Sequence, residues 1–382
     1  MSRMKREIRK GPVVLVFLLL ILTGCSDRLD IEDSTFPLAL AIDLDENNKL
    51  RLYITNPVFT PNIPKKHSEM EETGNSLRES RVRQDSHSPG VFQGRKFQVI
   101  VLSKRLLAHE NWFRLLDVIF RDSRNTVTDR IIAYDGPMEK LINMDHPDEP
   151  YVPMLLKGMV DTKSGRAETV KTTAQELHRE LYEKGITPAI AEVELDKKET
   201  LRLTGTALLD HKGKYQASLG PQESVLLRML QNKTRKIVSL TFTMPGYPEK
   251  GPFHSGTISF DAQKVNTSIK TLYAEDRFHF DIRIKTAVAL TERLFPFDVG
   301  NRGPELERML EEQMKQELET LIKKLQRHQV DPIGLGLYAR AYAYPHYKQI
   351  QDQWGQEFAR SHITIGVKVT IKAMGPVTST GG

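Results

Sequence analysis

Cysteine is almost absent from this 382-residue chain, whose one thiol belongs to Cys25. A disulfide within the chain needs two cysteines, and a cysteine-based zinc site needs several. With one cysteine, this chain can form neither by itself. A long apolar run is also missing. The longest, residues 13–22, is about half of the roughly 20 residues that a helix needs to span a bilayer. The sequence therefore predicts no transmembrane helix.

The residues that lead to Cys25 have the order of a secretory signal peptide. A basic stretch precedes the apolar run, and Leu22-Thr23-Gly24-Cys25 follows it. This ending resembles a bacterial lipobox, where the cysteine receives a diacylglyceryl group, with acyl chains such as palmitate, and the chain is cut before it. An ordinary signal peptide with an incidental cysteine is the alternative. The position of the only cysteine at the cleavage point favours lipidation of Cys25, with residues 1–24 removed.

Net charge is small once that segment is set apart. The whole chain carries +6, but its first 24 residues hold five basic side chains and one acid, which leaves +2 for the rest. The basic pI is thus partly a targeting signal, and nucleic acid is not an expected partner. Gly-x-Ser-x-Gly, His-Glu-x-x-His and phosphate-loop motifs are absent from the sequence. We therefore expect no enzyme, no cofactor and no metal site.

Strand and helix patterns alternate before residue 197. Two strands flanking the turn at residues 45–48 predict a β-hairpin over 36–44 and 50–55. Further predicted elements are strands at 97–102 and 130–134, a helix at 111–122, and a helix capped by Thr172 or Thr173. Residues 56–94 are rich in proline and charge, which predicts a long loop with one polar helix near 75–84.

Strand patterns dominate after residue 199. Strands are predicted at 201–210, 215–219, 237–243, 257–260, 278–284 and 363–371, and helices from Pro221, at 304–329 and at 337–342. Within 278–284, apolar and polar residues alternate strictly, which predicts one buried and one solvent-facing side. A β-rich region with helices near its end is typical of an α+β arrangement.

These patterns together predict a mixed α/β and α+β fold, a multi-lobed body of mixed sheets with packed helices behind a lipoprotein signal peptide. The charged run 196–199 lacks apolar residues for a core and marks a boundary. We expect an N-terminal α/β domain over 25–196 and a C-terminal α+β domain over 197–376, possibly divided into 197–255 and 256–376. A polar tail, 377–382, follows.

Aromatic residues gather near the end of the chain. They are Tyr338, Tyr342, Tyr344, Tyr347 and Trp354. Tyrosine and tryptophan supply large contact areas at interfaces, so this set is a candidate partner surface. The alternative is that most of them pack inside the domain.

Four segments, taken in order, resemble the Ger(x)C family, the lipoprotein C subunit of nutrient germinant receptors in spore-forming bacteria. They are residues 24–28 with 38–43, residues 99–102 running to 120–122, residues 205–210 leading to 226–230, and residues 330–336 followed by Tyr344-Pro345 and Trp354. The segments span almost the whole chain after the signal peptide. The resemblance implies a body of mixed α/β domains without catalysis.

The resemblance also implies a function. It is that of a lipid-anchored receptor subunit, needed for the germination response to nutrients, on the outer face of the spore inner membrane. Its expected partners are the integral-membrane A and B subunits. A different class of protein, an envelope enzyme, a solute-binding lipoprotein or an assembly lipoprotein, is the alternative. A pocket lined by convergent polar groups between two lobes would favour solute binding.

Overall fold

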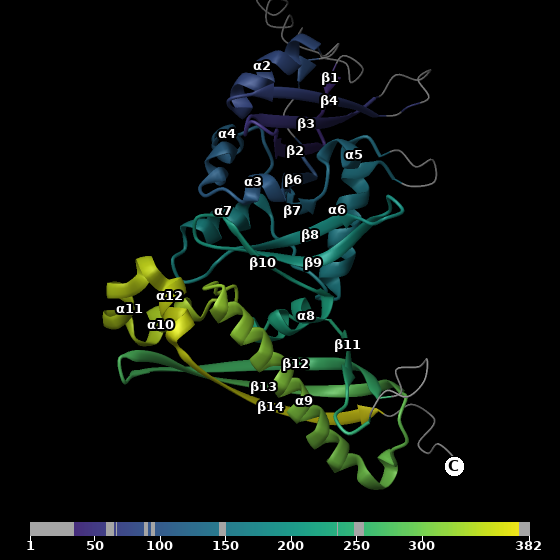
Figure 1. Ribbon diagram of the computed structural model, residues 1–382, viewed down its shortest axis with the longest axis vertical. Coiled ribbons are helices and arrows are strands. Elements are labelled where there is room, and N and C mark those ends of the chain that lie inside the picture. The colour runs from purple at the N-terminus through teal and green to yellow at the C-terminus, as the bar shows by residue number, and fades with distance from the viewer. Residues whose placement is uncertain are drawn as a thin grey trace, which may run out of the picture.

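The computed structural model describes residues 34–58, 65, 67–87, 91–92, 96–144, 150–234, 236–247 and 256–373. These residues form two lobes that follow one another along the long axis of the molecule, each built on its own sheet (Figure 1). Cys25, the signal peptide and the polar tail lie outside the described residues.

The N-terminal lobe is built on a mixed eight-stranded sheet. In spatial order its strands are β10 (Tyr215–Leu219), β9 (Leu201–Leu209), β8 (Ala189–Leu195), β7 (Arg130–Asp135), β6 (Val99–Ser103), β2 (Ala39–Leu44), β3 (Leu50–Pro57) and β4 (His67–Gly74). The four central strands, β8 to β2, pair in parallel, and the outer strands on both sides are antiparallel. The predicted hairpin is confirmed as β2 and β3.

Helices cover both faces of this sheet. One face carries α3 (Lys104–Leu107), the 3₁₀-helix η2 (Trp112–Leu116), α4 (Asp117–Arg121) and α7 (Ala174–Tyr182), and the other carries α5 (Met138–Ile142) and α6 (Val152–Gly165). Strand β2 sends Leu40 and Ile42 to the first face and Ala39 and Ala41 to the second. Burial on both faces explains why its sequence is almost continuously apolar.

The region predicted to be one long loop, residues 56–94, contains regular structure, so that prediction is wrong. Strand β4 extends the sheet, α2 (Leu77–His87) packs beside it, and the short β5 (Val91–Phe92) pairs in parallel with β1 (Ser34–Thr35). The predicted polar helix is confirmed as α2. Strand β4 was missed because an edge strand needs little apolar alternation, and this one carries three glutamates.

The C-terminal lobe is built on a four-stranded sheet. Its strands are, in spatial order, β11 (Val238–Thr243), β12 (Thr257–Ala274), β13 (Arg277–Arg293) and β14 (His362–Ala373). Strands β12 and β13 form a long hairpin, and β14 joins β13 in parallel. The alternation predicted for residues 278–284 is confirmed, since Phe278, Phe280, Ile282 and Ile284 are buried.

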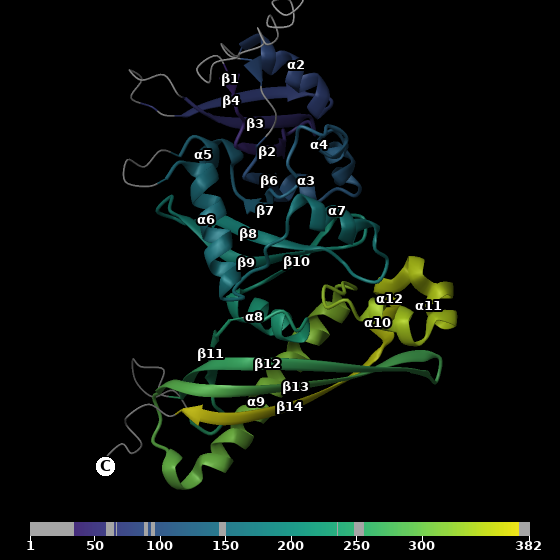
Figure 2. The same ribbon diagram turned by 180° about the vertical axis from the view of Figure 1, so that it is seen from behind.

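Helices pack on the apolar face of this second sheet. They are α8 (Pro221–Leu230), α9 (Val299–Arg327), α10 (Leu335–Tyr342), α11 (Tyr344–Ile350), the 3₁₀-helix η3 (Gln351–Gln353) and α12 (Trp354–Arg360). Figures 1 and 2 show the long α9 crossing the sheet, with α10 to α12 gathered beside the N-terminal lobe. The fold is therefore α/β in the first lobe and α+β in the second, as predicted.

Side chains occupy the hydrogen-bonding edges of the second sheet. On β14, the backbone N–H groups of Val369 and Ile371 donate to the carboxylates of Glu311 and Glu307, at 3.0 and 2.8 Å. Both glutamates lie on α9, one turn apart. On β11, the N–H of Thr241 lies 3.4 Å from the side-chain oxygen of Gln222 at the start of α8. Side chains from α9 and α8 thus occupy backbone N–H groups at both edges of the sheet, where another strand could otherwise pair.

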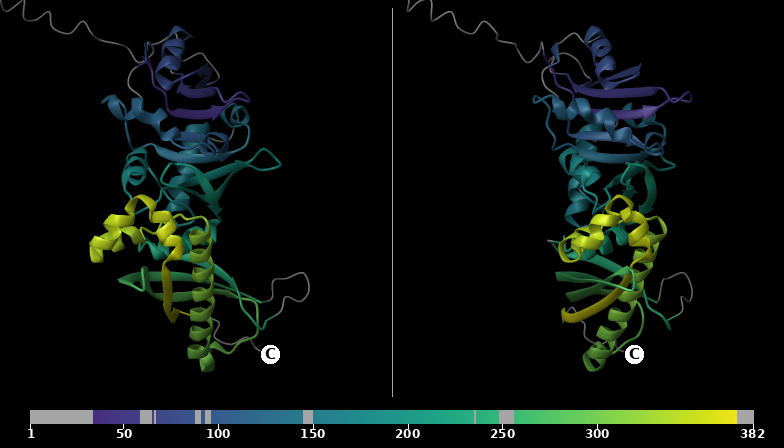
Figure 3. Two further views of the ribbon diagram at one scale, coloured as in Figure 1. Left: turned by 60° about the vertical axis from the view of Figure 1, so that its left-hand side comes forward. Right: turned by 90° about the vertical axis from the view of Figure 1, so that its left-hand side faces the viewer.

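Helix α8 joins the lobes. It contacts β9 and β10 of the first sheet and β11, β12 and β13 of the second. One apolar core accordingly holds Leu208 and Leu219 from the first sheet with Leu227 of α8 and Phe260 of the second. The further views in Figure 3 show the two lobes stacked one after the other. The two lobes therefore share one apolar core and are joined by more than the connecting chain.

The expected boundary at residues 196–199 falls in the turn between β8 and β9, which pair in one sheet. A piece beginning at residue 200 would keep most of the shared core but lose β8 as a partner, so independent folding of the two parts stays a prediction. The optional division at residue 255 is not found, because β11 and β12 are neighbours in the second sheet.

Candidate functional site

The first contact between the lobes centres on the buried carboxylate of Asp331, in the loop between α9 and α10. Its Oδ1 accepts a hydrogen bond from the N–H of Gly334 at 2.9 Å. Its Oδ2 accepts from the N–H of Gly336 at 3.0 Å and from Nε1–H of Trp354 at 2.8 Å. The backbone carbonyl of Asp331 accepts from the N–H of Thr187 in the N-terminal lobe, at 3.0 Å. Burial raises the pKa of Asp331, while these donors favour its charged form.

Two glycines close this contact, because their backbones touch. A Cβ on Gly336 would lie 2.6 Å from Cα of Gly185, and one on Gly185 would lie 2.8 Å from the carbonyl carbon of Gly336. Neither approach leaves room for a side chain. Gly334 adopts φ +86°, a left-handed conformation that favours glycine. We call residues Gly185, Thr187, Asp331, Gly334, Gly336 and Trp354 the junction.

Polar contacts surround the junction. Arg340 of α10 pairs with Glu183 at 2.8 Å, and Lys184 pairs with Asp352 at 2.6 Å. Nearby, Nε2–H of Gln231 donates to the carbonyl oxygen of Pro332 at 2.7 Å. The exposed ion pairs add little stability, because solvent screens them. Both ion pairs cross between the lobes beside the glycine contact.

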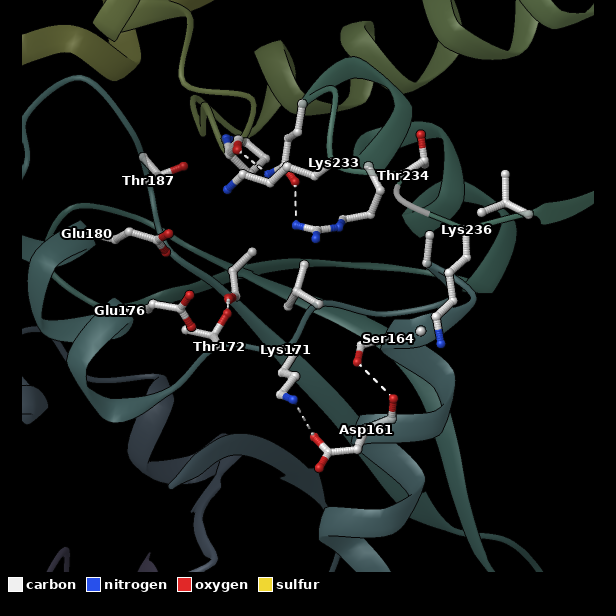
Figure 4. A pocket seen from close by; sticks show the side chains of 18 residues that line it. Asp161, Ser164, Lys171, Thr172, Glu176, Glu180, Thr187, Lys233, Thr234 and Lys236 are labelled. Carbon is white, nitrogen blue, oxygen red and sulfur yellow. Dashed lines mark hydrogen bonds and ion pairs between the residues drawn. The ribbon is translucent and has the colours of Figure 1, made fainter. Parts of the chain in front are cut away.

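The second contact borders a half-open cavity of about 560 Å³ between the lobes. Its walls come from α6, α7 and β8 of the N-terminal lobe and from the end of α8, the following turn and β11 of the C-terminal lobe. Figure 4 shows side chains from both lobes converging on this space. The volume lies in the range of small-molecule sites in proteins, which is about 300–1,000 Å³.

Neighbouring groups engage all three carboxylates at the cavity, and two of them, Asp161 and Glu176, have the shorter contacts. Asp161 pairs with Lys171 at 3.2 Å and with Arg130 at 2.8 Å. Glu176 accepts hydrogen bonds from the backbone N–H and hydroxyl of Thr173, at 2.9 and 3.0 Å, in the capping box of α7. Neither group is then a free negative charge.

The third carboxylate, Glu180, is largely buried and points into the cavity (Figure 4). Burial raises the pKa of Glu180 to about 7, although Lys233 and Arg179 act to lower it. Arg179 lies 3.3 Å away. At neutral pH this carboxyl is therefore only partly ionised.

The C-terminal lobe contributes three cations from one stretch of chain, namely Arg228, Lys233 and Lys236. Arg228 donates to the side-chain oxygen of Gln231 at 2.9 Å. Burial, and then the positive charge of Arg228, lower the pKa of Lys233. Within the described part of the chain, neither Lys233 nor Lys236 has a carboxylate within ion-pair distance. Positive charge thus gathers on one wall.

The aromatic set predicted as a partner surface is divided by the structure. Trp354 and Tyr347 are buried, at 0% and 1% exposure, so their assignment to a surface is corrected. Trp354 packs edge-on against Phe278, with ring centroids 5.5 Å apart, and Tyr338 is partly buried against the same core. Tyr342 and Tyr344 remain exposed, at 70% and 52%. We call these two the aromatic pair.

Sequence reasoning identified neither contact between the lobes. Residues 330–336 enter there only as one of the segments that carry the family resemblance, and no prediction concerns the cations of the cavity. A local signal existed for the junction, because an Asp-Pro followed by two glycines can form a tight turn around a carboxylate. Glu180 and Lys233 line the same cavity but lie far apart in the sequence, so no local pattern could predict that they come together.

No helix of the described chain combines the length and the apolar character needed to cross a bilayer. That finding concerns the helices in the structure alone. Lipidation of Cys25 remains a prediction.

Two family models match the chain, one to each part. Residues 27–195 match the model "Spore germination protein N-terminal domain", and residues 204–375 match "Spore germination B3/ GerAC like, C-terminal". The interval between the two matches contains the boundary expected at 196–199.

Curated relatives and a solved structure agree with these matches. Spore germination protein B3 of Bacillus subtilis is 22% identical, over 95% of this chain and 97% of its own. Spore germination protein KC of the same organism is 20% identical, over 91% and 90%. The crystal structure of the GerBC protein has the same fold, with a TM-score of 0.55 at 19% identity, over 90% of this chain and 99% of that one. The chain belongs to the GerAC-like family of spore germination proteins, which is the Ger(x)C family.

Proposed function

We propose that this protein is a lipid-anchored, non-catalytic subunit of a nutrient germinant receptor. The observation that carries the proposal is the match to spore germination proteins along nearly the full length of both chains. Integral-membrane A and B subunits are its proposed partners, and the outer face of the spore inner membrane is its proposed location. It acts by binding, with no substrate turned over.

The anchor is the diacylglyceryl group on Cys25, after removal of residues 1–24 as a signal peptide. Eight residues separate Cys25 from Ser34, and a chain of that length spans at most about 28 Å. Ser34 begins β1, at the end of the N-terminal lobe that is remote from the second sheet (Figure 1). The N-terminal lobe is thus held close to the membrane, and the C-terminal lobe extends away from it.

The proposed contact with a partner uses the aromatic pair, Tyr342 and Tyr344. Exposed tyrosines bury large areas at little entropic cost, and interface hot spots are enriched in them. Because the C-terminal lobe lies away from the membrane in this arrangement, its partner surface would be an extramembrane part of another subunit. Membrane attachment raises the local concentration of both partners.

Changing Cys25 to Ala tests the anchor. We expect the precursor of Cys25→Ala to lose lipid labelling, to resist the lipoprotein peptidase, and to support little nutrient germination in spores that lack the native copy. Ser26→Ala, one residue further, is the matched control and should be labelled and processed normally. Normal lipid labelling of Cys25→Ala would contradict the proposed anchor at Cys25. Full germination with the soluble, unlipidated protein would show that the anchor is not required for germination.

Replacing both members of the aromatic pair by alanine tests the partner surface. We expect Tyr342→Ala with Tyr344→Ala to change the melting temperature little, because both side chains are exposed. The same variant should lose co-purification with the membrane subunits and the response to nutrients. Tyr182→Ala, an equally exposed tyrosine on the N-terminal lobe, is the control.

A second comparison separates the surface from the core. Trp354→Ala should lower stability by about 3–5 kcal/mol, since it empties a buried aromatic site. An assembly defect that appears only in Trp354→Ala, and never in the double tyrosine variant, would place the interface elsewhere.

A further inference from the structure

Two histidine rings lie side by side on the second sheet. His279 of β13 is directly opposite His362, the first residue of β14, in the parallel pairing of these strands. Phe278 and Phe280, the neighbours of His279 along β13, are buried in the core beneath the helices. Because successive side chains of a strand point to opposite faces, and directly paired residues face the same way, both histidines lie on the face opposite to the helices. Their ring centroids are 5.5 Å apart, and the ring planes meet at 56°.

One hydrogen bond fixes which nitrogen of His279 keeps a lone pair. Its Nε2 lies 3.1 Å from the backbone carbonyl oxygen of Ala274, near the tip of the hairpin. A carbonyl can only accept, so Nε2 carries a hydrogen and donates it, and in the neutral ring Nδ1 keeps its lone pair. Histidines that bind metals usually donate their other ring N–H to a carbonyl or carboxylate in this way, which holds the ring in position. His279 therefore already has the supporting hydrogen bond of a metal ligand.

The separation of the two rings suits a metal ion between them. A zinc–nitrogen bond is about 2.0–2.1 Å long and the centre of an imidazole ring lies about 1.1 Å beyond the nitrogen, so metal and ring centre are about 3.1 Å apart. Two rings bound at a tetrahedral angle then have their centres about 5 Å apart. The observed 5.5 Å differs by an amount that a small rotation of the exposed His362 side chain can supply. Both histidines belong to paired strands, which hold ligands more precisely than loops do.

We propose that His279, through Nδ1, and His362 together bind one divalent transition metal ion such as Zn²⁺, with water completing a four-coordinate site. Neutral imidazole suits zinc, nickel and copper, whereas calcium and magnesium prefer oxygen ligands. Asp281, the next residue along this face of β13, pairs with Arg283 at 2.9 Å and is not a ligand as placed. Among the described residues, no group of three or more histidine, cysteine or acidic side chains could hold a metal. The proposed site therefore has two protein ligands.

The position of the two histidines gives a bound metal a structural effect. No local motif predicts this site, because α9 to α12 separate His279 from His362 in the sequence and only the pairing of β14 with β13 brings them together. A metal that bridges the two would fasten the start of β14, which directly follows α12, to the long hairpin. A ligand that binds only the folded arrangement stabilises it by an amount that grows with ligand concentration. This inference goes beyond the proposed receptor role and does not depend on it.

Isothermal titration calorimetry with Zn²⁺ alone tests the proposal on the full chain, purified in detergent without a histidine tag. Bound metal is first removed with a chelator, and any free thiol of Cys25 is alkylated so that it cannot bind zinc. We expect a site that fills at micromolar zinc, and no binding of Mg²⁺ at the same concentrations. Zinc should also raise the melting temperature, because only the folded chain brings the two rings together.

Variants locate the site. His362→Asn removes an exposed side chain, so the variant should fold. It should weaken zinc binding about tenfold or more, because losing a ligand should cost at least as much as losing a group that supports one. His279→Asn should weaken binding as much, although it also removes the hydrogen bond to Ala274. His109→Asn, at another exposed histidine in the turn after α3, is the matched control and should bind zinc as the unmodified chain does. The rise in melting temperature with zinc should disappear in the first two variants and persist in the third.

Three results would overturn the proposal. One is the absence of zinc binding by the full chain up to millimolar concentration. Another is an unchanged zinc affinity in both His362→Asn and His279→Asn, which would place the bound zinc elsewhere. The third is an equal loss of affinity in His109→Asn and His362→Asn, which would reveal general binding to surface histidines. Since all readouts use purified protein, they are independent of whether the receptor role holds.

Discussion

The two contacts between the lobes are built in opposite ways, although both join the same pair of sheets. At the junction, both carboxylate oxygens of Asp331 are hydrogen-bonded and two glycine backbones touch. At the cavity, Lys233 and Lys236 come from the C-terminal lobe, and burial raises the pKa of Glu180 to about 7. The Asp331 carboxylate thus has the satisfied hydrogen bonds of a structural group, whereas Glu180 has the raised pKa of a desolvated carboxyl, which is common at functional sites.

This difference indicates that the junction mainly stabilises the fold, whereas the cavity has a different role. At the junction, the touching glycine backbones and the hydrogen bond from the Thr187 N–H to the Asp331 carbonyl join the two lobes, so displacing one lobe would disrupt both contacts. In the cavity beside it, burial disfavours the charged form of Glu180, and binding a proton removes that cost. Substitutions at the junction should therefore affect folding most, and substitutions at the cavity should affect stability mildly and in a pH-dependent way.

The largest effect is expected from Gly336→Ala. The added methyl would meet the backbone of Gly185, which cannot move aside as a flexible side chain could. We expect a loss of about 2–5 kcal/mol in the free energy of unfolding, measured by urea denaturation. Gly158→Ala on α6 is the control, because its Cβ would meet nothing within 4 Å, and it should be neutral or stabilising. Equal stability of both variants would show that the junction is not tightly packed.

Asp331→Asn should come next. The amide has one acceptor oxygen where the carboxylate has two, so its NH₂ group would face the N–H donors of the junction. A loss of about 2–4 kcal/mol is expected, since a buried donor is left without a partner. A double-mutant cycle with Trp354→Phe measures the coupling through the indole N–H. A coupling energy near zero would mean that this hydrogen bond contributes little.

Glu180→Gln is expected to have the smallest effect, and the opposite sign. The folded-state pKa of Glu180 is raised to about 7, whereas an unfolded glutamate ionises near pH 4.3. Between these values the folded protein keeps a proton that the unfolded chain has lost, so stability falls as pH rises through the window. The charged neighbours Lys233, Arg179 and Glu176 shape this titration.

At pH 8, Glu180→Gln should therefore be more stable than the unmodified chain, by about 1–3 kcal/mol. The gain should shrink towards zero by pH 4. Glu46→Gln, at an exposed turn, should show no such trend. A pH-independent effect would mean that Glu180 is ionised throughout, and the contrast between junction and cavity would weaken.

Much of the fold could be predicted because its signals are local. The cap of α7, predicted at Thr172 or Thr173, is at Thr173, and the predictions of Pro221 in the first turn of α8 and of alternation within β13 are confirmed. For α9 the predicted start at Pro304 was close. The helix begins at Val299 and has non-helical torsion angles at Arg302, as expected near a proline.

The candidate site could not be predicted in the same way. The approach of Gly185 to Gly336 joins positions about 150 residues apart, and it depends on how α10 docks on the other lobe. The sequence leaves Trp354 with two alternatives, a partner surface or the core, and its packing against Phe278 decides for the core. Strand β4 needed its neighbour β3 to be recognised. In each case the deciding interaction is tertiary.

The covered edges of the second sheet affect how copies of this protein interact when they are crowded together. A chain held in the plane of a membrane, as proposed, meets copies of itself at a high local concentration. An open strand edge would then invite one molecule to continue the sheet of the next. Glu307 and Glu311 engage the outer N–H groups of β14, and Gln222 lies against β11, so growth at either edge would first have to displace them. Dense clusters of this protein should therefore keep separate sheets.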